Sequence, residues 1–349
     1  MLSYRKLAMR VLSRPLHTGG GIDSPRPASQ RAAAFILTAI MLTTLAAPAF
    51  AKTWYIEDGD ITVKASDTGN DVTQKDKTTY GDKDTIITNR NEGTASSNTV
   101  TIEAEKKDDK VEVTLKDVNI DTSSRNKAAV SVTGEGDTNI KLNGDNALKS
   151  DIYRSGIYGS GSLTISGGEN DSLTAQGGSG ANGISSSGSL TISGGTVTAN
   201  GDDGGRGISS SGSVTISGGS TVTANGGSGT ISGGDGICSS GGVTISGGST
   251  VTANGGNGGS LVGGDGIRSG GGLTVSDGTV TAKGGNGDSK DGYGGDGIRS
   301  GGGVTISGNT VNAAGGYGGK VGGYGICSFD RVAISGGTDR KSTRLNSSH

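Results

Sequence analysis

Residues 233–254 read GGDGICSSGGVTISGGSTVTAN, and variants of this phrase recur between Gly156 and Thr338. The Gly-Ile pair that opens each copy occurs seven times, at successive spacings of 27, 24, 29, 30, 31 and 28 residues. Repetition at such a period is typical of a solenoid, in which each copy forms one turn and stacks on the next. The sequence therefore predicts a stacked repeat protein, although a chain with 70 glycines would otherwise suggest a disordered linker.

Each copy contains three short runs of alternating apolar and polar residues, separated by glycine-rich turns. Three strands per turn, in rungs of about 24–31 residues, predict an all-β protein with the fold of a right-handed parallel β-helix. Side chains alternate between the two faces of a strand, so one set of each copy points inward and the other outward. In one copy the expected inward residues are Ile267, Leu273, Val275, Val280 and Ala282, and the expected outward residues are Arg268, Thr274, Thr279 and Thr281.

The two ends of the chain differ from the repeat. Residues 1–31 contain six Lys or Arg and one acid, and they precede an apolar run at 32–46 and the motif Ala-Phe-Ala at 49–51. This order predicts a secretory signal peptide over residues 1–51, with a retained membrane anchor as the alternative. We therefore expect a secreted, extracellular or cell-surface protein that has no membrane contact after signal cleavage.

The last residues, 339–349, read DRKSTRLNSSH and resemble no rung. They are similar to the translation of a common sequencing adapter, so we expect a non-native tail and a repeat truncated at Thr338; an ordinary polar tail is the alternative. Between the two ends, we expect an N-terminal cap or lead-in β segment at 52–95 and the β-helix at 96–338, with regular rungs from 156. Ala129 precedes Ile157 by one rung length, which predicts that the ladder begins before the obvious repeat.

The charge of the segment 52–338 limits its partners. This segment contains 22 Lys and Arg against 31 Asp and Glu, a net charge of −9, so no nucleic acid is expected as a partner. It contains no histidine, because His17 and His349 lie in the two ends. The missing histidine excludes Ser-His-Asp and Cys-His catalysis and His-ligated zinc within the segment.

Two cysteines, Cys238 and Cys327, both follow a Gly-Ile pair. They lie three rungs apart, which at about 4.8 Å per rung is about 14 Å, whereas a disulfide tolerates a Cα separation of about 7 Å. We therefore expect two free thiols.

The position before each Gly-Ile pair forms a column of polar residues. Three aspartates, Asp235, Asp265 and Asp296, occupy it in successive rungs. Stacked carboxylates repel one another unless a cation lies between them, so the column predicts a Ca²⁺ site, to which the loop acids Asp288 and Asp291 could add ligands. The alternative is structural: Asp caps turn amides, and arginines in the next strand can pair with the acids.

Tyrosines and threonines supply two further patterns. Tyr293, Tyr317 and Tyr324 fall in the corner loops of the last rungs, where flat rings could stack on sugars or simply plug the loops. Outward Thr-x-Thr pairs predict a regular hydroxyl ladder, which is typical of ice-binding solenoids but also of ordinary strands. The tyrosines of the first rung are Tyr153 and Tyr158, and the threonine pairs are Thr196/Thr198, Thr221/Thr223, Thr250/Thr252 and Thr279/Thr281.

From about Val111 onward the chain resembles a known family. The segments VTLKDVNIDTS at 113–123 and NIKLNGDNALKS at 139–150, together with the repeated GGDGIxSxGGVTISGG, are similar to the bacterial carbohydrate-binding β-helix proteins of cellulolytic clostridia. The resemblance implies a secreted, non-catalytic protein that binds cell-wall polysaccharide, either cellulose or a polygalacturonate-like chain, with calcium as a structural ion. Under this interpretation the candidate sugar-binding residues are Tyr293, Tyr317, Tyr324, Arg268 and Arg299.

Three other functions remain open. A structural surface adhesin or stalk would use the repeats only for length. A polysaccharide lyase would use Arg268 and Arg299 beside Asp265 and Asp296, although repetition of the same motif in two rungs favours a structural role. An ice-binding protein would use the threonine pairs.

Overall fold

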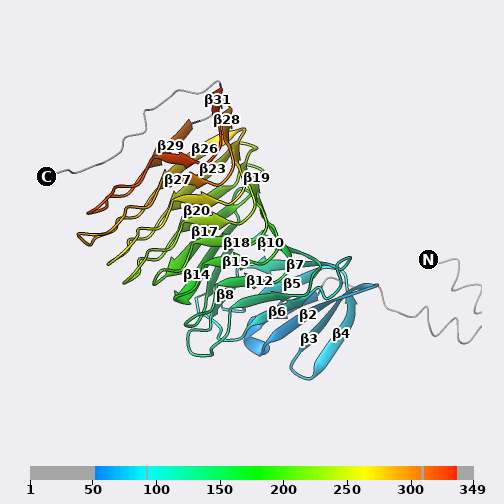
Figure 1. The fold of residues 1–349 in the computed structure, drawn as a ribbon. Coiled ribbons are helices and arrows are strands. Elements are labelled where there is room, and N and C mark those ends of the chain that lie inside the picture. Colours follow the sequence, from blue (N-terminus) through cyan, green and yellow to red (C-terminus); the bar gives the residue numbers. More distant parts are fainter. Residues whose placement is uncertain (1–51, 92, 308–309, 336–349) are drawn as a thin grey trace, which may run out of the picture. The chain divides into compact units, whose positions relative to one another are not determined.

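The computed structural model describes residues 52–91, 93–307 and 310–335 (Figure 1). The expected signal peptide and the expected non-native tail lie outside the described residues. The described part is built of short β strands and one 3-10 helix, η1 (Ile56–Asp58), without an α-helix. None of its helices is long and apolar enough to cross a membrane.

The strands form three sheets, which we call A, B and C, in a solenoid of about nine turns. Sheet A contains, in spatial order, β1 (Lys52–Tyr55), β5 (Thr85–Thr88), β7 (Lys110–Lys116), β10 (Asp137–Asn143), β13 (Ser162–Ser166), β16 (Leu190–Ser193), β19 (Val214–Ser217), β22 (Val243–Ile245), β25 (Leu273–Val275), β28 (Val304–Ser307) and β31 (Val332–Ser335). Sheet B contains β4 (Lys77–Asp82), β3 (Gly69–Gln74), β2 (Ile61–Ser66), β6 (Val100–Glu103), β9 (Val130–Thr133), β12 (Ile157–Gly159), β15 (Ile184–Ser186), β18 (Ile208–Ser210), β21 (Ile237–Ser239), β24 (Ile267–Ser269), β27 (Ile298–Ser300) and β30 (Ile326–Ser328). Sheet C contains β8 (Asn119–Asp121), β11 (Asp145–Lys149), β14 (Ser172–Ser179), β17 (Thr196–Asp202), β20 (Thr221–Asn225), β23 (Ser249–Asn254), β26 (Gly278–Lys283) and β29 (Thr310–Ala314).

Each regular rung passes through sheets B, A and C in turn, and neighbouring rungs pair in parallel. The repeated phrase produces the register, because identical residues lie opposite one another: Ile237 pairs with Ile267, and Thr250 pairs with Thr279. The backbone groups of one rung are satisfied by the rungs on either side, so a rung cannot fold alone. The predicted parallel β-helix with three strands per turn is confirmed.

The core consists of aliphatic columns inside the three sheets. Ile237, Ile267 and Ile298 each have no exposed surface, and each such side chain contributes about 1.5–3 kcal/mol by its removal from water. The five residues expected to point inward are all buried, and the four expected to point outward are exposed or half-buried. The alternation of apolar and polar residues therefore correctly predicted which of these side chains lie in the core and which lie on the surface.

The ladder begins well before the obvious repeat. β1 pairs in parallel with β5, and β2 pairs in parallel with β6, while β2, β3 and β4 form antiparallel hairpins at one end of sheet B. The residue that pairs with Ile157 is Val130, not Ala129, which takes the place of Gly156. The expected register was thus wrong by one residue at this junction, because the position held by glycine in later rungs is held by alanine here.

The two cysteines are free and occupy one column of sheet B. Cys238 pairs with Arg268, Arg268 with Arg299, and Arg299 with Cys327, so the thiols lie three rungs apart as predicted. Burial is the main cause that raises the pKa of both thiols. A raised pKa lowers the thiolate fraction and disfavours a nucleophilic role.

Glycine-rich loops connect sheet C to the next strand of sheet B and protrude from one corner (Figure 1). Successive loops touch through isolated bridges, among them Gly229 with Gly258 and Gly258 with Gly287. The approach is so close that a Cβ on Gly264 would lie 1.9 Å from the carbonyl oxygen of Gly234. Glycine is required there because no side chain fits between stacked loops.

Candidate binding groove

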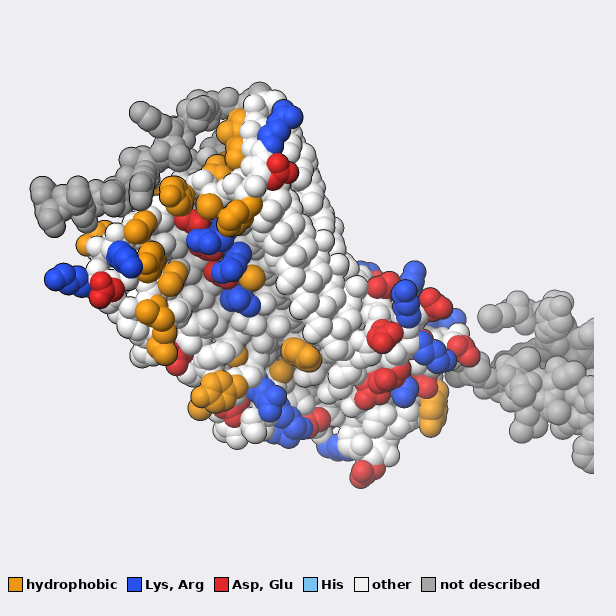
Figure 2. All heavy atoms as spheres, in the orientation of Figure 1, with side chains coloured by type: hydrophobic (Ala, Val, Ile, Leu, Met, Phe, Trp, Pro, Cys, Tyr) orange, Lys and Arg blue, Asp and Glu red, His pale blue; other side chains and the backbone are white. Residues whose placement is uncertain are grey.

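A groove lies between the outer face of sheet B and the loops that lead into it. Each loop ends at the residue before Gly-Ile, and the next strand then presents one outward side chain, as Arg268 does on β24. The cavity has a volume of about 580 Å³, and we call it the arginine groove. Figure 2 shows basic side chains gathered beside hydrophobic side chains of the loops. Its polar lining residues are Asn182, Arg206, Ser232, Asp235, Asp265, Arg268 and Arg299.

The aspartate column at the floor of the groove forms a ladder of side chain to backbone hydrogen bonds. The backbone N–H of Asp265 donates to Asp235 Oδ1 at 2.9 Å, and the N–H of Asp296 donates to Asp265 Oδ1 at 2.7 Å. The ladder continues to Tyr324, whose N–H donates to Asp296 Oδ1 at 2.7 Å. Asn182 accepts from the N–H of Arg206 in the same way at 2.8 Å. One acceptor oxygen per rung therefore satisfies a backbone donor of the next rung.

The second oxygen of each aspartate faces an arginine. Arg206 Nε donates to Asp235 Oδ2 at 3.2 Å. Arg299 reaches two acids: its Nε lies 3.1 Å from Asp265 Oδ2, and its terminal nitrogen lies 3.0 Å from Asp296 Oδ2. These two contacts lack hydrogen-bond geometry, so Asp296 Oδ2 and Arg299 Nε are buried ion-paired atoms without a hydrogen-bond partner. Electrostatic attraction to Asp265 and Asp296, rather than directed hydrogen bonding, therefore keeps the Arg299 side chain beside the column.

Burial and the close spacing of charged groups shift pKa values in the aspartate column. Burial, with the charge of Asp235 as the next cause, raises the pKa of Asp265 to about 6. Although burial disfavours its charged form, the carboxylates of Asp265 and Asp296 raise the pKa of Arg299. The guanidinium is therefore held firmly protonated.

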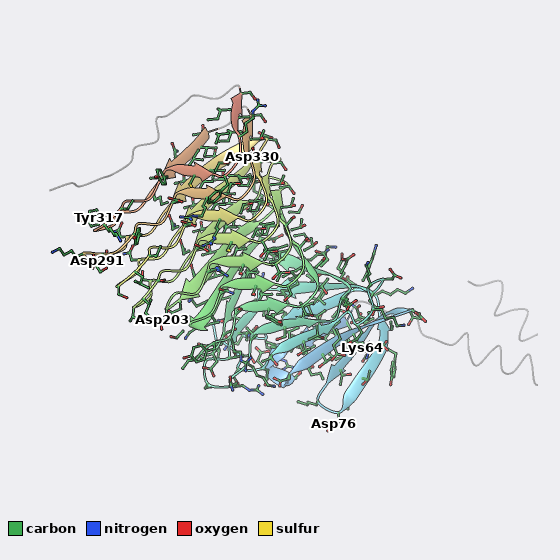
Figure 3. All side chains as sticks on the ribbon, viewed as in Figure 1. Lys64, Asp76, Asp203, Asp291, Tyr317 and Asp330 are labelled. Atoms are coloured by element: carbon green, nitrogen blue, oxygen red, sulfur yellow. The ribbon has the colours of Figure 1, made fainter. Side chains whose placement is uncertain are left out.

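The residues of the column do not suit the calcium ion that their stacking led us to expect. Calcium takes six to eight oxygen ligands, whereas the carboxylate oxygens here face backbone N–H groups and guanidinium groups. Asp288 and Asp291 are exposed, and Asp291 lies toward the outer end of its loop, away from the buried column (Figure 3). Among the described residues, no three Asp, Glu, Cys or His side chains are grouped as metal ligands.

The three predicted loop tyrosines are exposed, by 39% for Tyr293, 44% for Tyr317 and 47% for Tyr324. Tyr324 belongs to the aspartate column, directly beside Asp296. Tyr293 pairs with Val262 of the preceding loop, and Lys320 Nζ lies 5.1 Å from its ring centre. Two further exposed apolar side chains on these loops are Ile231 and Leu261. The rings are thus surface groups and not plugs.

Arg268 differs from its neighbours in the groove. It is exposed, and it forms no ion pair or hydrogen bond within residues 52–91, 93–307 and 310–335. Arg206 and Arg299 are already engaged by aspartates. Arg268 is therefore the guanidinium of this groove that is free to meet an anionic ligand.

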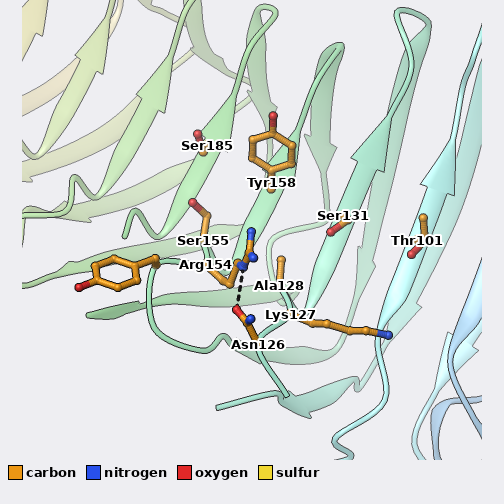
Figure 4. A pocket seen from close by; sticks show the side chains of 10 residues that line it. Thr101, Asn126, Lys127, Ala128, Ser131, Arg154, Ser155, Tyr158 and Ser185 are labelled. Atoms are coloured by element: carbon orange, nitrogen blue, oxygen red, sulfur yellow. Dashed lines mark hydrogen bonds between the residues drawn. The ribbon is translucent and has the colours of Figure 1, made fainter. Parts of the chain in front are cut away.

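A second cavity, of about 590 Å³, lies along the same outer face of sheet B (Figure 4). Its lining includes the outward residues Ser131, Tyr158 and Ser185 of successive rungs. Ser185 belongs to the same rung as Asn182 of the arginine groove, so the two cavities adjoin. The remaining polar lining consists of Thr101 of β6 and of the loop residues Asn126, Lys127, Tyr153, Arg154 and Ser155.

The sequence pattern drew attention to Tyr153 and Tyr158 but not to Arg154 or Lys127. Arg154 Nε donates to Asn126 Oδ1 at 3.3 Å and has no acidic partner in the described chain, while Lys127 Nζ lies 3.0 Å from Asp60. Aligning the irregular rungs on Val130 and Ile157 would have placed Arg154 beside this face. Without that alignment, the sequence does not indicate that a basic residue in a loop lies beside this face of sheet B.

No family model matches this chain, and no match is found among curated proteins or among solved structures.

Proposed function

We propose that this protein is a secreted, non-catalytic carbohydrate-binding protein whose two adjoining cavities on sheet B hold a polysaccharide strand. The observation that carries the proposal is the free, exposed guanidinium of Arg268 in a groove whose lining residue Val262 pairs with the exposed loop residue Tyr293. Aromatic rings stack on the C–H faces of sugars, and a guanidinium binds carboxylates through two parallel hydrogen bonds. The arrangement therefore suits a sugar polymer that carries acidic groups.

The repeat supports a linear polymer rather than a compact ligand. Outward positions of sheet B recur once per rung, at a strand spacing of about 4.8 Å. Tyr158, Ser185, Arg268 and Arg299 all occupy this position in different rungs. A ligand that repeats its own units along its length can use the same type of contact in each rung.

The charges in the cavities favour an acidic glycan such as a polygalacturonate-like chain over neutral cellulose. Among the described residues, Arg154 and Arg268 have no acidic partner, whereas the aspartates of the column are held by Arg206 and Arg299. An anionic polymer can therefore approach without displacing an existing ion pair. Neutral cellulose would use the rings but leave these guanidinium groups without a partner.

A binding role is favoured over lyase chemistry by the state of Arg299. A lyase needs a base that can lose its proton near neutral pH, and the neighbouring carboxylates raise the pKa of Arg299 instead. The chain between residues 52 and 338 also offers no histidine as a base. No contact of the proposed complex depends on calcium, because the carboxylate oxygens of the column already face backbone N–H and guanidinium groups.

The test is co-sedimentation of the purified protein with polygalacturonate gel and with cellulose, each with and without a chelator. We expect retention on polygalacturonate, a clear loss in Arg268→Gln, and no loss in Arg331→Gln, a matched change of an exposed arginine outside the groove. Retention of neither glycan, or equal losses in both variants, would contradict the proposal. A loss with chelator alone would show that calcium supports the complex.

A further inference from the structure

The outer face of sheet C carries two parallel rows of threonine, one pair per rung. On strands β17 to β26 the pairs lie in register without a shift, so each threonine has another threonine beside it in the next rung. The first row is exposed and the second is half-buried. The rows consist of Thr196, Thr221, Thr250 and Thr279, and of Thr198, Thr223, Thr252 and Thr281.

The hydroxyl groups of these eight threonines have no partner in the part of the chain that the structure describes. None of them donates or accepts a hydrogen bond within the described residues. No charged side chain interrupts either row between Thr196 and Thr281. Because each hydroxyl both donates and accepts, the face must be satisfied by water or by another uncharged hydrogen-bonding surface.

The array is rigid. Threonine is branched at Cβ and has restricted χ1 freedom, and the residues between the two rows, such as Val222 and Val251, are buried in the core. A third row borders the threonines: Asn225 Nδ2 donates to Asn200 Oδ1, and Asn254 Nδ2 donates to Asn225 Oδ1, both at 2.8 Å. A surface that is already ordered loses little entropy when it binds an ordered partner.

The strand geometry gives the array two regular repeats. Neighbouring rungs are about 4.8 Å apart, and alternate residues of one strand are about 6.7 Å apart. From these observations we propose that the threonine face of sheet C binds ice, by holding a layer of water molecules in a lattice that continues into the crystal. Water is the uncharged partner that can both donate to and accept from every hydroxyl in both rows.

A crystalline polysaccharide is the competing occupant, and the face does not favour it. Strands β17, β20, β23 and β26 present no aromatic ring on which a sugar could stack, whereas sheet B and its loops present several. The inference therefore concerns a different surface from the arginine groove and does not depend on the proposed glycan binding.

The test is thermal hysteresis and incorporation into slowly growing ice, measured on the wild-type protein and on two double variants. Thr223→Lys with Thr252→Lys places charges in the second row of sheet C. Thr215→Lys with Thr244→Lys makes the same change on sheet A, where single threonines lie in register but no second threonine row accompanies them. We expect ice binding by the wild type, its loss in the sheet C variant and its retention in the sheet A variant.

Three results would overturn the proposal. The first is a wild-type protein that produces no hysteresis and is excluded from ice, a result that does not depend on the folding of any variant. The second is an equal loss in both variants when circular dichroism shows that both keep the β signal. The third is a sheet C variant that keeps ice binding but loses sedimentation with crystalline cellulose, which would identify a glycan as the occupant.

Discussion

Neutralising Asp265 should stabilise the protein above pH 7, although the change removes one partner of an ion pair. Burial and the charge of Asp235 raise the pKa of Asp265 from 3.8 to about 6. The difference is about 2 pK units, and at about 1.4 kcal/mol per unit the folded carboxylate costs about 3 kcal/mol when ionised. The side chain is only 6% exposed, so solvent screens little of this cost.

The direction of the pH dependence follows from whether the folded or the unfolded state holds the proton of Asp265. Between about pH 4 and pH 6 the folded protein keeps the proton of Asp265 while the unfolded chain has lost it, so the free energy of unfolding falls as the pH rises through this window. In Asp265→Asn the carbonyl oxygen can still accept from the N–H of Asp296, as Asn182 accepts from Arg206. Arg299 keeps Asp296 as its partner.

We therefore expect Asp265→Asn to raise the free energy of unfolding by about 1–3 kcal/mol at pH 8 and to leave it nearly unchanged at pH 4. Asp265→Ala is the matched control: it removes the charge but also the acceptor, and a buried N–H without a partner costs about 1–3 kcal/mol. The measurement is unfolding in denaturant, followed by circular dichroism at both pH values. An Asp265→Asn variant that is less stable than wild type at pH 8 would contradict this prediction, because the ionised carboxylate would then be net favourable.

Three further predictions concern the core, the loops and the ion pairs. Ile237→Ala should cost about 2–5 kcal/mol of unfolding free energy by opening a cavity in a fully buried column, whereas Ile231→Ala, at a residue 60% exposed, should change it little; equal effects would contradict the column model. Gly264→Ala should lower the thermal midpoint of unfolding more than Gly248→Ala. A Cβ at 264 would lie 1.9 Å from a carbonyl oxygen, whereas a Cβ at 248 meets nothing within 4 Å and only the positive φ is unfavourable. The reverse order would show that the loops are not tightly stacked. Arg299→Gln should destabilise by about 3–5 kcal/mol at pH 8 and regain part of this loss at pH 5, where Asp265 can take up a proton although Asp296 has still lost its partner; a loss of stability that does not vary with pH would show that packing, not charge, is the role of Arg299.

The period of the repeat was enough to predict the rungs, their three strands and the inward columns, because stacking places like residues on like. Counting rungs also predicted correctly that Cys238 and Cys327 lie three rungs apart. It failed by one residue at Ala129, where the glycine that marks later rungs is absent and Val130 takes the pairing position. Pattern alone therefore predicts register wherever the marker residue is present.

The chemistry of the column was less accessible to sequence reasoning. Stacking predicted that Asp235, Asp265 and Asp296 would be neighbours, but not that each would accept the N–H of the next rung. The two copies of Gly-Ile-Arg look alike, yet Arg299 bridges two acids while Arg268 faces solvent. Such differences arise from side-chain conformation and local burial, which cannot be predicted from a repeated sequence motif.

Calorimetric titration of the wild-type protein and of Arg268→Gln with polygalacturonate oligomers of increasing length is the decisive test of glycan binding in the two cavities. We expect the affinity of the wild type to rise with oligomer length as more rungs of the two cavities are engaged, and we expect Arg268→Gln to weaken binding at every length that reaches the arginine groove. Binding that is independent of length, or that is unchanged in Arg268→Gln while the fold is intact, would contradict this expectation.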